Sequence, residues 1–183
     1  MKHLYIIRHA QSIANSSHKV VGSIDSPLSD LGREQAKIAG RTIKKHFKID
    51  AIYCSPLSRA QETAQIIAKN ANINPGKIST LSNLRERNLG EMEGASYGQL
   101  INKQYDGNFE DVEKAKGLEP IKDFYARAKN VLNFISKQPQ DNILLVCHNG
   151  IGRMLQTVVK NNKPLKLYTE PRMENAVVYK LKK

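Results

Sequence analysis

Arginine and histidine side chains follow three separate apolar segments of the chain, each at the point where the segment ends. Arg8 and His9 come directly after the run LYII, and His148 follows NILLVC. Arg59 lies in SPLSRAQETA, just after the run AIYC. Guanidinium groups bind phosphate oxygens bidentately, and a neutral imidazole can act as a nucleophile near physiological pH. If the three segments meet, these residues form a pocket for a small dianion, and phosphate is the simplest candidate.

Short apolar runs alternate with longer amphipathic ones, and this alternation predicts how the segments meet. Strands are expected at 4–7, 51–54, 77–81, 142–147 and from 176. Helices are expected at 29–47, 57–70, 121–135 and from about 151. The pattern is typical of an α/β fold, here a three-layer sandwich with a largely parallel central sheet and helices on both faces. Such sheets bind ligands at the carboxyl ends of their strands, which is where the pattern places Arg8, His9, Arg59 and His148.

The first expected helix shows most clearly how its ends and its buried face can be predicted. Ser29 is a suitable N-cap residue because its hydroxyl can accept a hydrogen bond from the first helical turn. The apolar residues near helical spacing, which predict the buried face, are Leu31, Ala36, Ala39, Ile43 and Phe47.

Length and composition limit the class of protein. The 183 residues suit one domain, 1–183. No apolar run reaches the ~20 residues of a membrane helix, and the apolar stretch near the N-terminus lacks the pattern of a signal peptide. We therefore expect a cytoplasmic protein without a membrane partner. Cys54 and Cys147 each end an apolar run, where a buried free thiol is expected rather than a disulfide.

The formal net charge of +12 favours anionic ligands. Most of the excess is lysine dispersed along the chain, and no nucleic-acid-binding motif accompanies it, so a nucleic-acid partner is not expected. A small phosphorylated substrate is the expected partner. The oligomeric state stays open, with a homodimer as one alternative.

The motifs together resemble a known family. In chain order they are RHAQSIAN, GSIDSPLSDLGREQA, SPLSRAQETA, LRERNLGEMEG and VCHNG. In this order they are similar to the histidine phosphatase superfamily, also called the phosphoglycerate mutase-like family. The resemblance covers nearly the whole chain and implies an α/β sandwich in which the histidine of the opening RH pair is phosphorylated during turnover.

The resemblance also implies roles for individual residues. We expect neither a bound metal nor a cofactor. His9 matches the nucleophile, and Glu86 matches the group that donates and accepts the proton. Matching positions that hold phosphoryl oxygens or contact the ligand are Arg8, Arg59, His148, Asn15, Gly22 and Asn149. The role of Glu86 is chemically sensible, since a leaving alkoxide needs a proton and an attacking water must lose one.

The sequence departs from the family pattern at two positions beside the histidines. Ala10 and Asn149 stand where the family commonly has glycine. Backbone approach to the phosphate is therefore expected to differ slightly, while every reacting group is retained.

Three other hypotheses use some of the same residues. The segment CHNGIGR, 147–153, fits the C-x5-R loop of cysteine-dependent phosphatases, which would make Cys147 the nucleophile. His9, His148 and Glu86 could instead form a metal site, although arginines at the same point would repel a divalent ion. A third hypothesis is a non-catalytic protein that only binds phosphorylated ligands.

Within the family, a cofactor-dependent phosphoglycerate mutase is the main alternative to a metal-independent phosphomonoesterase. Mutases of the family carry a longer insertion between the acid and the second histidine, with paired arginines that grip the substrate carboxylate. Here that segment is short and the stretch 95–120 contains no arginine, which favours the phosphatase. We expect this stretch to be an insertion that caps the pocket. Its candidates for touching substrate are Tyr97, Lys103, Tyr105 and Lys116.

Overall fold

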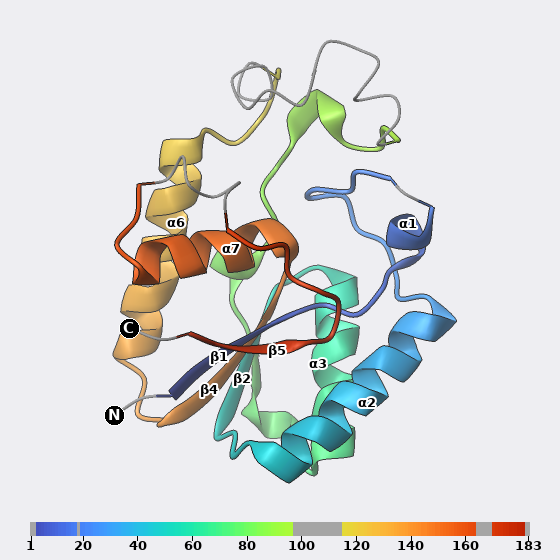
Figure 1. Ribbon diagram of the computed structural model, residues 1–183, viewed down its shortest axis with the longest axis vertical. Helices are drawn as coiled ribbons and strands as arrows, with labels where there is room; N and C mark the ends of the chain where they lie inside the picture. The colour runs from blue at the N-terminus through green and yellow to red at the C-terminus, as the bar shows by residue number, and fades with distance from the viewer. Residues whose placement is uncertain (1–2, 18, 97–114, 164–169, 182–183) are drawn as a thin grey trace.

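The computed structural model of the chain describes residues 3–17, 19–96, 115–163 and 170–181. A five-stranded sheet runs through its centre in the order β3-β2-β4-β1-β5 (Figure 1). The strands are β1 (His3–Arg8), β2 (Ala51–Cys54), β3 (Ile78–Thr80), β4 (Asn142–Cys147) and β5 (Val178–Leu181). The first four are parallel, and β5 lies antiparallel to β1 at the edge. The expected α/β class with a largely parallel sheet is confirmed.

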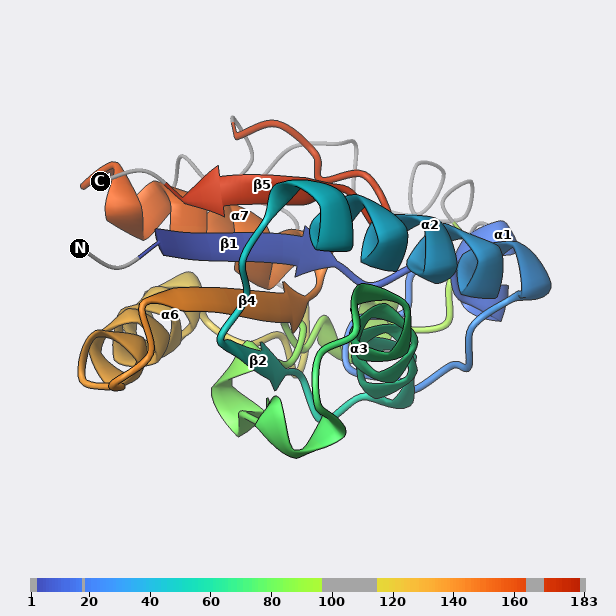
Figure 2. The same cartoon turned by 90° about the horizontal axis from the view of Figure 1, so that it is seen from below.

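Helices cover both faces of the sheet, as Figure 2 shows with the strands running across the view. The α-helices are α1 (Ile13–Ser16), α2 (Asp30–His46), α3 (Ser58–Ala71), α6 (Ile121–Ser136) and α7 (Asn149–Val159). Short 3-10 helices span Pro75–Lys77, Ser82–Leu84 and Gly90–Met92. Helices α2 and α3 pack on one face of the sheet, and α6 and α7 pack on the other.

The central strand β4 shows why the sheet needs cover on both sides. Leu145 and Cys147 belong to the core beneath α6 and α7, whereas Leu144 and Val146 belong to the core beneath α2 and α3. Successive side chains of a strand point to opposite faces, so a strand buried on both faces has a continuous apolar sequence. Each fully buried side chain of this size contributes about 1.5–3 kcal/mol. Helices on both faces therefore hold the strand ends rigidly.

Most element boundaries agree with the sequence pattern, and the differences have local causes. The Ser29 hydroxyl caps α2 by accepting from the Gly32 N–H at 3.0 Å, as expected. Leu31 does not belong to the buried face of α2, because its side chain is 56% exposed. Helix α7 begins at Asn149 rather than near Ile151, because a carboxylate from another segment binds the first N–H groups of the helix. The short helix α1 has no buried residue and was not expected.

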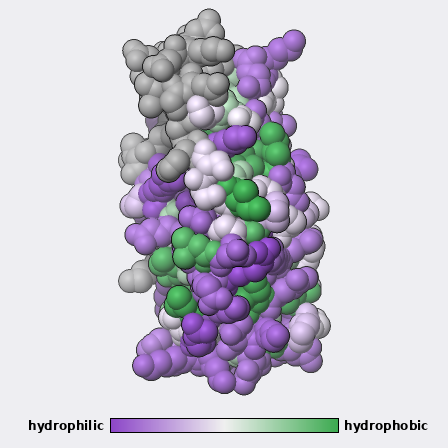
Figure 3. All heavy atoms as spheres, turned by 90° about the vertical axis from the view of Figure 1, so that its right-hand side faces the viewer, coloured by the Kyte–Doolittle hydropathy of each residue, from purple (hydrophilic) through white to green (hydrophobic). Residues whose placement is uncertain are grey.

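The outer surface over α2, which faces the viewer in Figure 3, is mainly hydrophilic with scattered apolar residues. Among the described residues, no helix is long and apolar enough to cross a membrane.

The expected capping insertion falls mostly on residues 97–114, including Tyr97, Lys103 and Tyr105, and these lie outside the described residues. Lys116 is described and exposed, and its backbone pairs with Glu91.

Helices α2 and α3 cross closely at Gly40, which gives a test of the packing. A Cβ atom at this position would lie 2.6 Å from Cβ of Asn70 and 2.9 Å from the Ile67 carbonyl oxygen. Helix propensity alone predicts that Gly40→Ala stabilises the protein by about 1 kcal/mol. The crowding instead predicts a loss of about 1–3 kcal/mol in the free energy of unfolding, measured in urea. The control Arg41→Ala, on the exposed side of α2, is expected to change stability by less than about 0.5 kcal/mol. A stabilised Gly40→Ala variant would contradict the packing.

Candidate active site

The carboxyl ends of β1, β2 and β4 meet at a pocket of about 290 Å³ that most of the predicted residues line. His148 is next to the lining residues His9 and Asn149 without being one of them. Arg8 and His9 at the end of β1 line this pocket, together with Arg59 from the first turn of α3. His148 follows β4, and its ring centroid lies 5.0 Å from that of His9. The His9 N–H donates to the Cys147 carbonyl at 2.8 Å, so the pairing of β1 with β4 continues up to the two histidines.

The hydrogen bonds of His9 determine which ring nitrogen can react. Nδ1 lies 2.7 Å from the Ala10 carbonyl oxygen, which can only accept a hydrogen bond. Nδ1 therefore carries the proton, and Nε2 of the neutral ring keeps its lone pair. The backbone on either side is also held, because Asn175 Nδ2 donates to the His9 carbonyl at 2.7 Å and the Ala10 N–H donates to Thr63 Oγ1 at 3.1 Å. These contacts give Nε2 a defined direction.

His148 is oriented through Ser55, at the end of β2. Its Nε2 lies 2.7 Å from Ser55 Oγ, which also accepts from the Leu57 N–H at 3.3 Å. Because Ser55 Oγ already accepts one hydrogen bond, its hydroxyl can donate its own hydrogen to Nε2 of His148. The ring hydrogen of the neutral His148 is then on Nδ1. Nδ1 is buried and has no hydrogen-bond partner in the described part of the chain. It is suited to donating to a ligand oxygen.

Burial and neighbouring cations keep both imidazoles neutral. His9 is 3% exposed and His148 is 1% exposed. Burial lowers the pKa of His9, and the positive charges of Arg59 and Arg8 lower it further. Burial likewise lowers the pKa of His148, with additional contributions from His9 and Arg59. Neutral imidazole is the form that a nucleophile requires.

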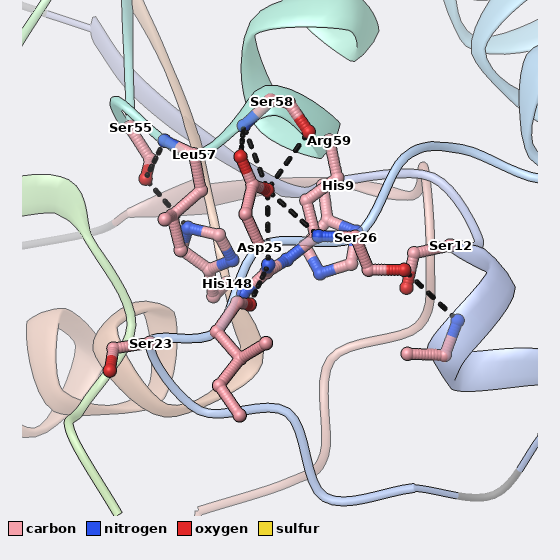
Figure 4. A network of polar contacts seen from close by, with 12 residues as sticks. His9, Ser12, Ser23, Asp25, Ser26, Ser55, Leu57, Ser58, Arg59 and His148 are labelled. Atoms are coloured by element: carbon pink, nitrogen blue, oxygen red, sulfur yellow. Dashed lines mark hydrogen bonds and ion pairs between the residues drawn. The ribbon is translucent and has the colours of Figure 1, made fainter. Parts of the chain in front are cut away.

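Main-chain carbonyl groups hold the two arginines in place. Figure 4 shows Arg59 beside Asp25 and Ser58. Arg59 is 2% exposed and donates to the Ile24 carbonyl at 2.7 Å and to the Gly22 carbonyl at 2.9 Å. Arg8 donates to the Met173 carbonyl at 3.1 Å. A carbonyl oxygen orients a guanidinium without cancelling its charge. The carboxylate of Asp25, 3.6 Å from Arg59, is half exposed and also binds the N–H of Ser58 at the start of α3.

The loop that carries Gly22 closes over Arg59 and needs glycine at that position. Gly22 has a φ of +49°, and a Cβ atom there would collide with the Glu93 carboxylate. Glu93 holds the loop by accepting from the Ser23 N–H at 2.7 Å and from the Leu89 N–H at 2.9 Å. The predicted contact position Gly22 thus lines the pocket as backbone.

Glu86, the predicted proton donor and acceptor, lines the same pocket and binds the N-terminus of α7. Its carboxylate accepts from the N–H groups of Gly150 at 2.8 Å and Ile151 at 3.0 Å. A Cβ atom at position 150 would lie 2.5 Å from this carboxylate, so glycine is needed for the approach. The site therefore contains an oriented carboxylate that faces the same space as His9.

The two asparagines predicted to contact ligand also line the pocket, but their side-chain oxygens are already used. Asn15 Oδ1 accepts from the Ser12 N–H at 3.4 Å in the cap of α1. Asn149 Oδ1 accepts from the Met173 N–H at 3.0 Å. Only their amide NH2 groups can donate to an anion in this arrangement.

Several residues of the site were not found from the sequence. The pocket is also lined by Lys19, Arg87, Arg153 and Arg172. Arg127 lies behind Glu86 and donates to the carbonyls of Asn83 at 2.8 Å and Arg85 at 2.7 Å. One feature of the sequence indicated Arg127, namely that this charged residue falls on the apolar face of the expected helix 121–135. Lys19 and Arg172 gave no such signal, because exposed cations are frequent in this lysine-rich chain.

Two of the alternative hypotheses do not fit this geometry. The Cys147 thiol is fully buried, its Sγ lies 3.7 Å from the His148 carbonyl oxygen, and burial raises its pKa, which opposes a thiolate nucleophile. Within the described residues, no three His, Cys, Asp or Glu side chains are placed to hold one metal ion, so His9, His148 and Glu86 do not form a ligand set.

Comparison with known proteins identifies the family of the chain. Residues 4–182 match the histidine phosphatase superfamily, branch 1. Phosphoglycerate mutase-like protein 4 of Arabidopsis thaliana is 35% identical over 161 residues, which cover 83% of this chain and 68% of that protein. Metal-independent phosphoserine phosphatase of Arabidopsis thaliana is 26% identical over 159 residues, covering 83% of this chain and 66% of the relative.

A solved structure shows the same fold. The mycobacterial glucosyl-3-phosphoglycerate phosphatase, in complex with VO3, has a TM-score of 0.86 with this chain. It is 24% identical, and the match covers 98% of this chain and 92% of the mycobacterial protein. The three-layer arrangement of this chain is therefore that of a known enzyme fold.

The lowered pKa values of the two histidines give a test by NMR. In long-range 1H–15N spectra, His9 and His148 should remain neutral at pH 6, with the proton of His9 on Nδ1. In urea the same imidazoles should titrate near the usual value of about 6.5. Below that pH the unfolded chain binds protons that the folded protein does not, so the free energy of unfolding should fall as pH drops through this range. His9→Gln and His148→Gln assign the signals. If both imidazole rings of the folded protein are protonated at pH 6, their pKa values are not lowered and the neutral state of His9 and His148 is wrong.

Proposed function

The chain belongs to branch 1 of the histidine phosphatase superfamily, and on that premise we propose that it is a metal-independent phosphomonoesterase acting on small phosphorylated metabolites through a phosphohistidine intermediate. The observation that carries the proposal is the neutral, buried His9, whose Nε2 is left unprotonated in a pocket that Arg8 and Arg59 also line. A phosphoryl group that approaches this nitrogen is balanced by fixed positive charge without a metal ion.

In the first half of the reaction, His9 Nε2 attacks the phosphorus atom of the ester. The N–P bond forms as the P–O bond to the leaving group breaks, and the three remaining phosphoryl oxygens are held by Arg8, Arg59 and His148. The leaving alkoxide takes a proton from Glu86, which lies on the same pocket wall.

In the second half, water replaces the leaving group. Glu86, now a carboxylate, takes a proton from the water as its oxygen attacks phosphorus. The N–P bond breaks, phosphate leaves, and His9 and Glu86 return to their starting protonation states. One carboxyl group serves both steps, which is consistent with its fixed position on the N-terminus of α7.

Water, rather than a second phosphoglycerate, is the proposed acceptor. No arginine occurs between Arg87 and Arg127, so the insertion lacks the arginine pair that the family resemblance gives to mutases. Arg127 is itself occupied by the Glu119 carboxylate, with contacts of 2.8 and 2.6 Å. The similarity to a metal-independent phosphoserine phosphatase supports hydrolysis, whereas the similarity to a mutase-like protein keeps phosphoglycerate mutase as the alternative.

Phosphate release and isomerisation can be measured on the same enzyme stock. We expect hydrolysis of p-nitrophenyl phosphate to continue in EDTA, and His9→Ala to lower kcat by at least about 10⁴-fold because the nucleophile is lost. His46→Ala, on the exposed end of α2, is the matched control and should retain activity.

The mutase alternative predicts a different product. If 2- and 3-phosphoglycerate interconvert about tenfold faster than phosphate appears, with the bisphosphorylated primer supplied, retransfer is favoured over water attack and the phosphatase proposal is wrong. Activity that disappears in EDTA and returns with a divalent ion would contradict metal independence. Failure to hydrolyse any phosphomonoester would favour the non-catalytic binding hypothesis.

A further inference from the structure

Arg127 is a buried charged residue on α6 that the proposed mechanism does not use. It is 8% exposed, and its guanidinium lies over the ring of Phe124, 4.8 Å from the centroid. Phe124 lines the pocket, whereas Arg127 is not among the described lining residues. A buried charge is costly unless it is paired and hydrogen-bonded. The partners of Arg127 therefore indicate what it holds in place.

One partner is the carboxylate of Glu119, which Arg127 binds in a fork. Nε of Arg127 donates to Oε1 at 2.8 Å, and Nη2 donates to Oε2 at 2.6 Å. The side chains of Arg127 and Glu119 are 9% and 17% exposed. A buried ion pair is weak evidence for stability, because the cost of removing both charges from water offsets their attraction. The pair does give the guanidinium plane a fixed orientation.

The other donors of Arg127 bind the loop that carries Glu86. Nη1 donates to the carbonyls of Asn83 at 2.8 Å and Arg85 at 2.7 Å, and Nη2 donates to the Glu86 carbonyl at 3.4 Å. Together with the Glu119 contacts, these bonds give all five N–H groups of the guanidinium an acceptor. Arg127 therefore fixes the main chain at Glu86.

The main chain of Glu119 binds the same loop further along. Its N–H donates to the Asn88 carbonyl at 2.9 Å, and its carbonyl accepts from the Arg87 guanidinium at 2.9 and 2.7 Å. Helix α6 begins shortly after Glu119 and is anchored in the core by Phe124. The segment 83–88 is thus attached to α6 by a closed set of hydrogen bonds.

The carboxylate of Glu86 is held separately, at the other end of the side chain. It accepts from the N–H groups of Gly150 at 2.8 Å, Ile151 at 3.0 Å and Arg87 at 2.9 Å. Helix α7 and the loop itself therefore orient the carboxylate, while Arg127 holds the backbone from which the side chain extends. A proton donor must lie within hydrogen-bond reach of the oxygen it protonates, so a small shift of that backbone impairs the transfer.

We propose that Arg127, oriented by Glu119, is a positioning residue for Glu86. It holds the main chain of residues 83–86 so that the Glu86 carboxyl group meets the leaving oxygen in the first half of the reaction and the attacking water in the second. Arg127 itself touches neither the substrate nor the phosphoryl group. This inference rests on the proposed phosphatase function and on the role of Glu86 in it.

Two aryl esters distinguish a loss of proton transfer from a general loss of activity. Phenolate is a stronger base than p-nitrophenolate, so phenyl phosphate depends more on a proton from Glu86 than p-nitrophenyl phosphate does. The readout is kcat/KM, which reports the steps up to cleavage of the P–O bond. The value of kcat is unsuitable, because Glu86 also serves the hydrolysis of the phosphohistidine that both esters share.

Arg127→Lys keeps the charge beside Glu119 but cannot bind the carboxylate and the loop carbonyls with one planar group. We expect it to lower kcat/KM for phenyl phosphate by at least about tenfold and that for p-nitrophenyl phosphate by less than about threefold. Lys122→Met, at an exposed position of the same helix, is the matched control and should leave both values unchanged. Circular dichroism checks folding. Arg127→Met combined with Glu119→Met leaves no buried charge unpaired and should show the same selective loss.

Combination with Glu86→Gln tests whether Arg127 acts through Glu86. Glu86→Gln alone should cause the selective loss for phenyl phosphate. In that background, Arg127→Lys should change kcat/KM for phenyl phosphate by less than about twofold, because there is no proton transfer left to position.

The outcomes separate this inference from the proposed function. If Arg127→Lys lowers kcat/KM equally for both esters, lowers neither, or has its full effect in the Glu86→Gln background, Arg127 does not position Glu86. The inference is then wrong, and phosphate release by the unaltered protein leaves the phosphatase function standing. If Glu86→Gln shows no selective loss, the inference is also wrong. No phosphate release from either ester by the unaltered protein would overturn the proposed function and the inference together.

Discussion

Two buried guanidinium groups held by main-chain carbonyls are the interaction on which the rest of this site depends. Arg59 donates to the carbonyls of Gly22 and Ile24, and Arg8 donates to that of Met173. Carbonyl oxygens orient these groups without adding negative charge, and several cations but only one acidic residue occur among the described lining residues, so the pocket keeps a positive potential. Burial lowers the pKa of His9, and this potential lowers it further, so the nucleophile stays neutral beside an anion-binding site.

The same hydrogen bonds connect segments that are distant in sequence. Arg59 holds the Gly22 loop, Arg8 holds the segment before β5, and Glu86 joins its own loop to the start of α7. The rigid base for these contacts is the sheet, in which β1 and β4 are buried between two helical layers. A phosphoryl-transfer site needs such fixed geometry, since most of its catalytic effect comes from position and preorganised charge. In this protein the loops carry the chemistry, and their positions come from the strand ends.

Much of this arrangement could be predicted from the sequence. The continuous apolar runs at 4–7 and 142–147 predict strands that are buried on both faces, and both strands are present. The family motifs indicated His9, Glu86 and their cationic neighbours. Residues such as Ser55, Arg172 and Asn175 could not be identified, because their roles depend on contacts across more than 90 positions of sequence or on facing a shared pocket. The motif CHNGIGR shows the opposite failure. Its spacing fits a thiolate loop, but the backbone turns the Cys147 side chain into the core.

Mapping the covalent intermediate tests the central claim most directly. The enzyme is mixed with a fast phosphomonoester substrate, quenched in alkali within the first turnover, digested, and analysed by mass spectrometry and 31P NMR. The account predicts one phosphoryl group on Nε2 of His9, stable in alkali and lost in acid, because Nδ1 is occupied by the Ala10 carbonyl. The adduct should form equally in Cys147→Ala, whose side chain is buried away from the reaction. A phosphoryl group on Cys147, on His148 or on Nδ1 of His9 would contradict it.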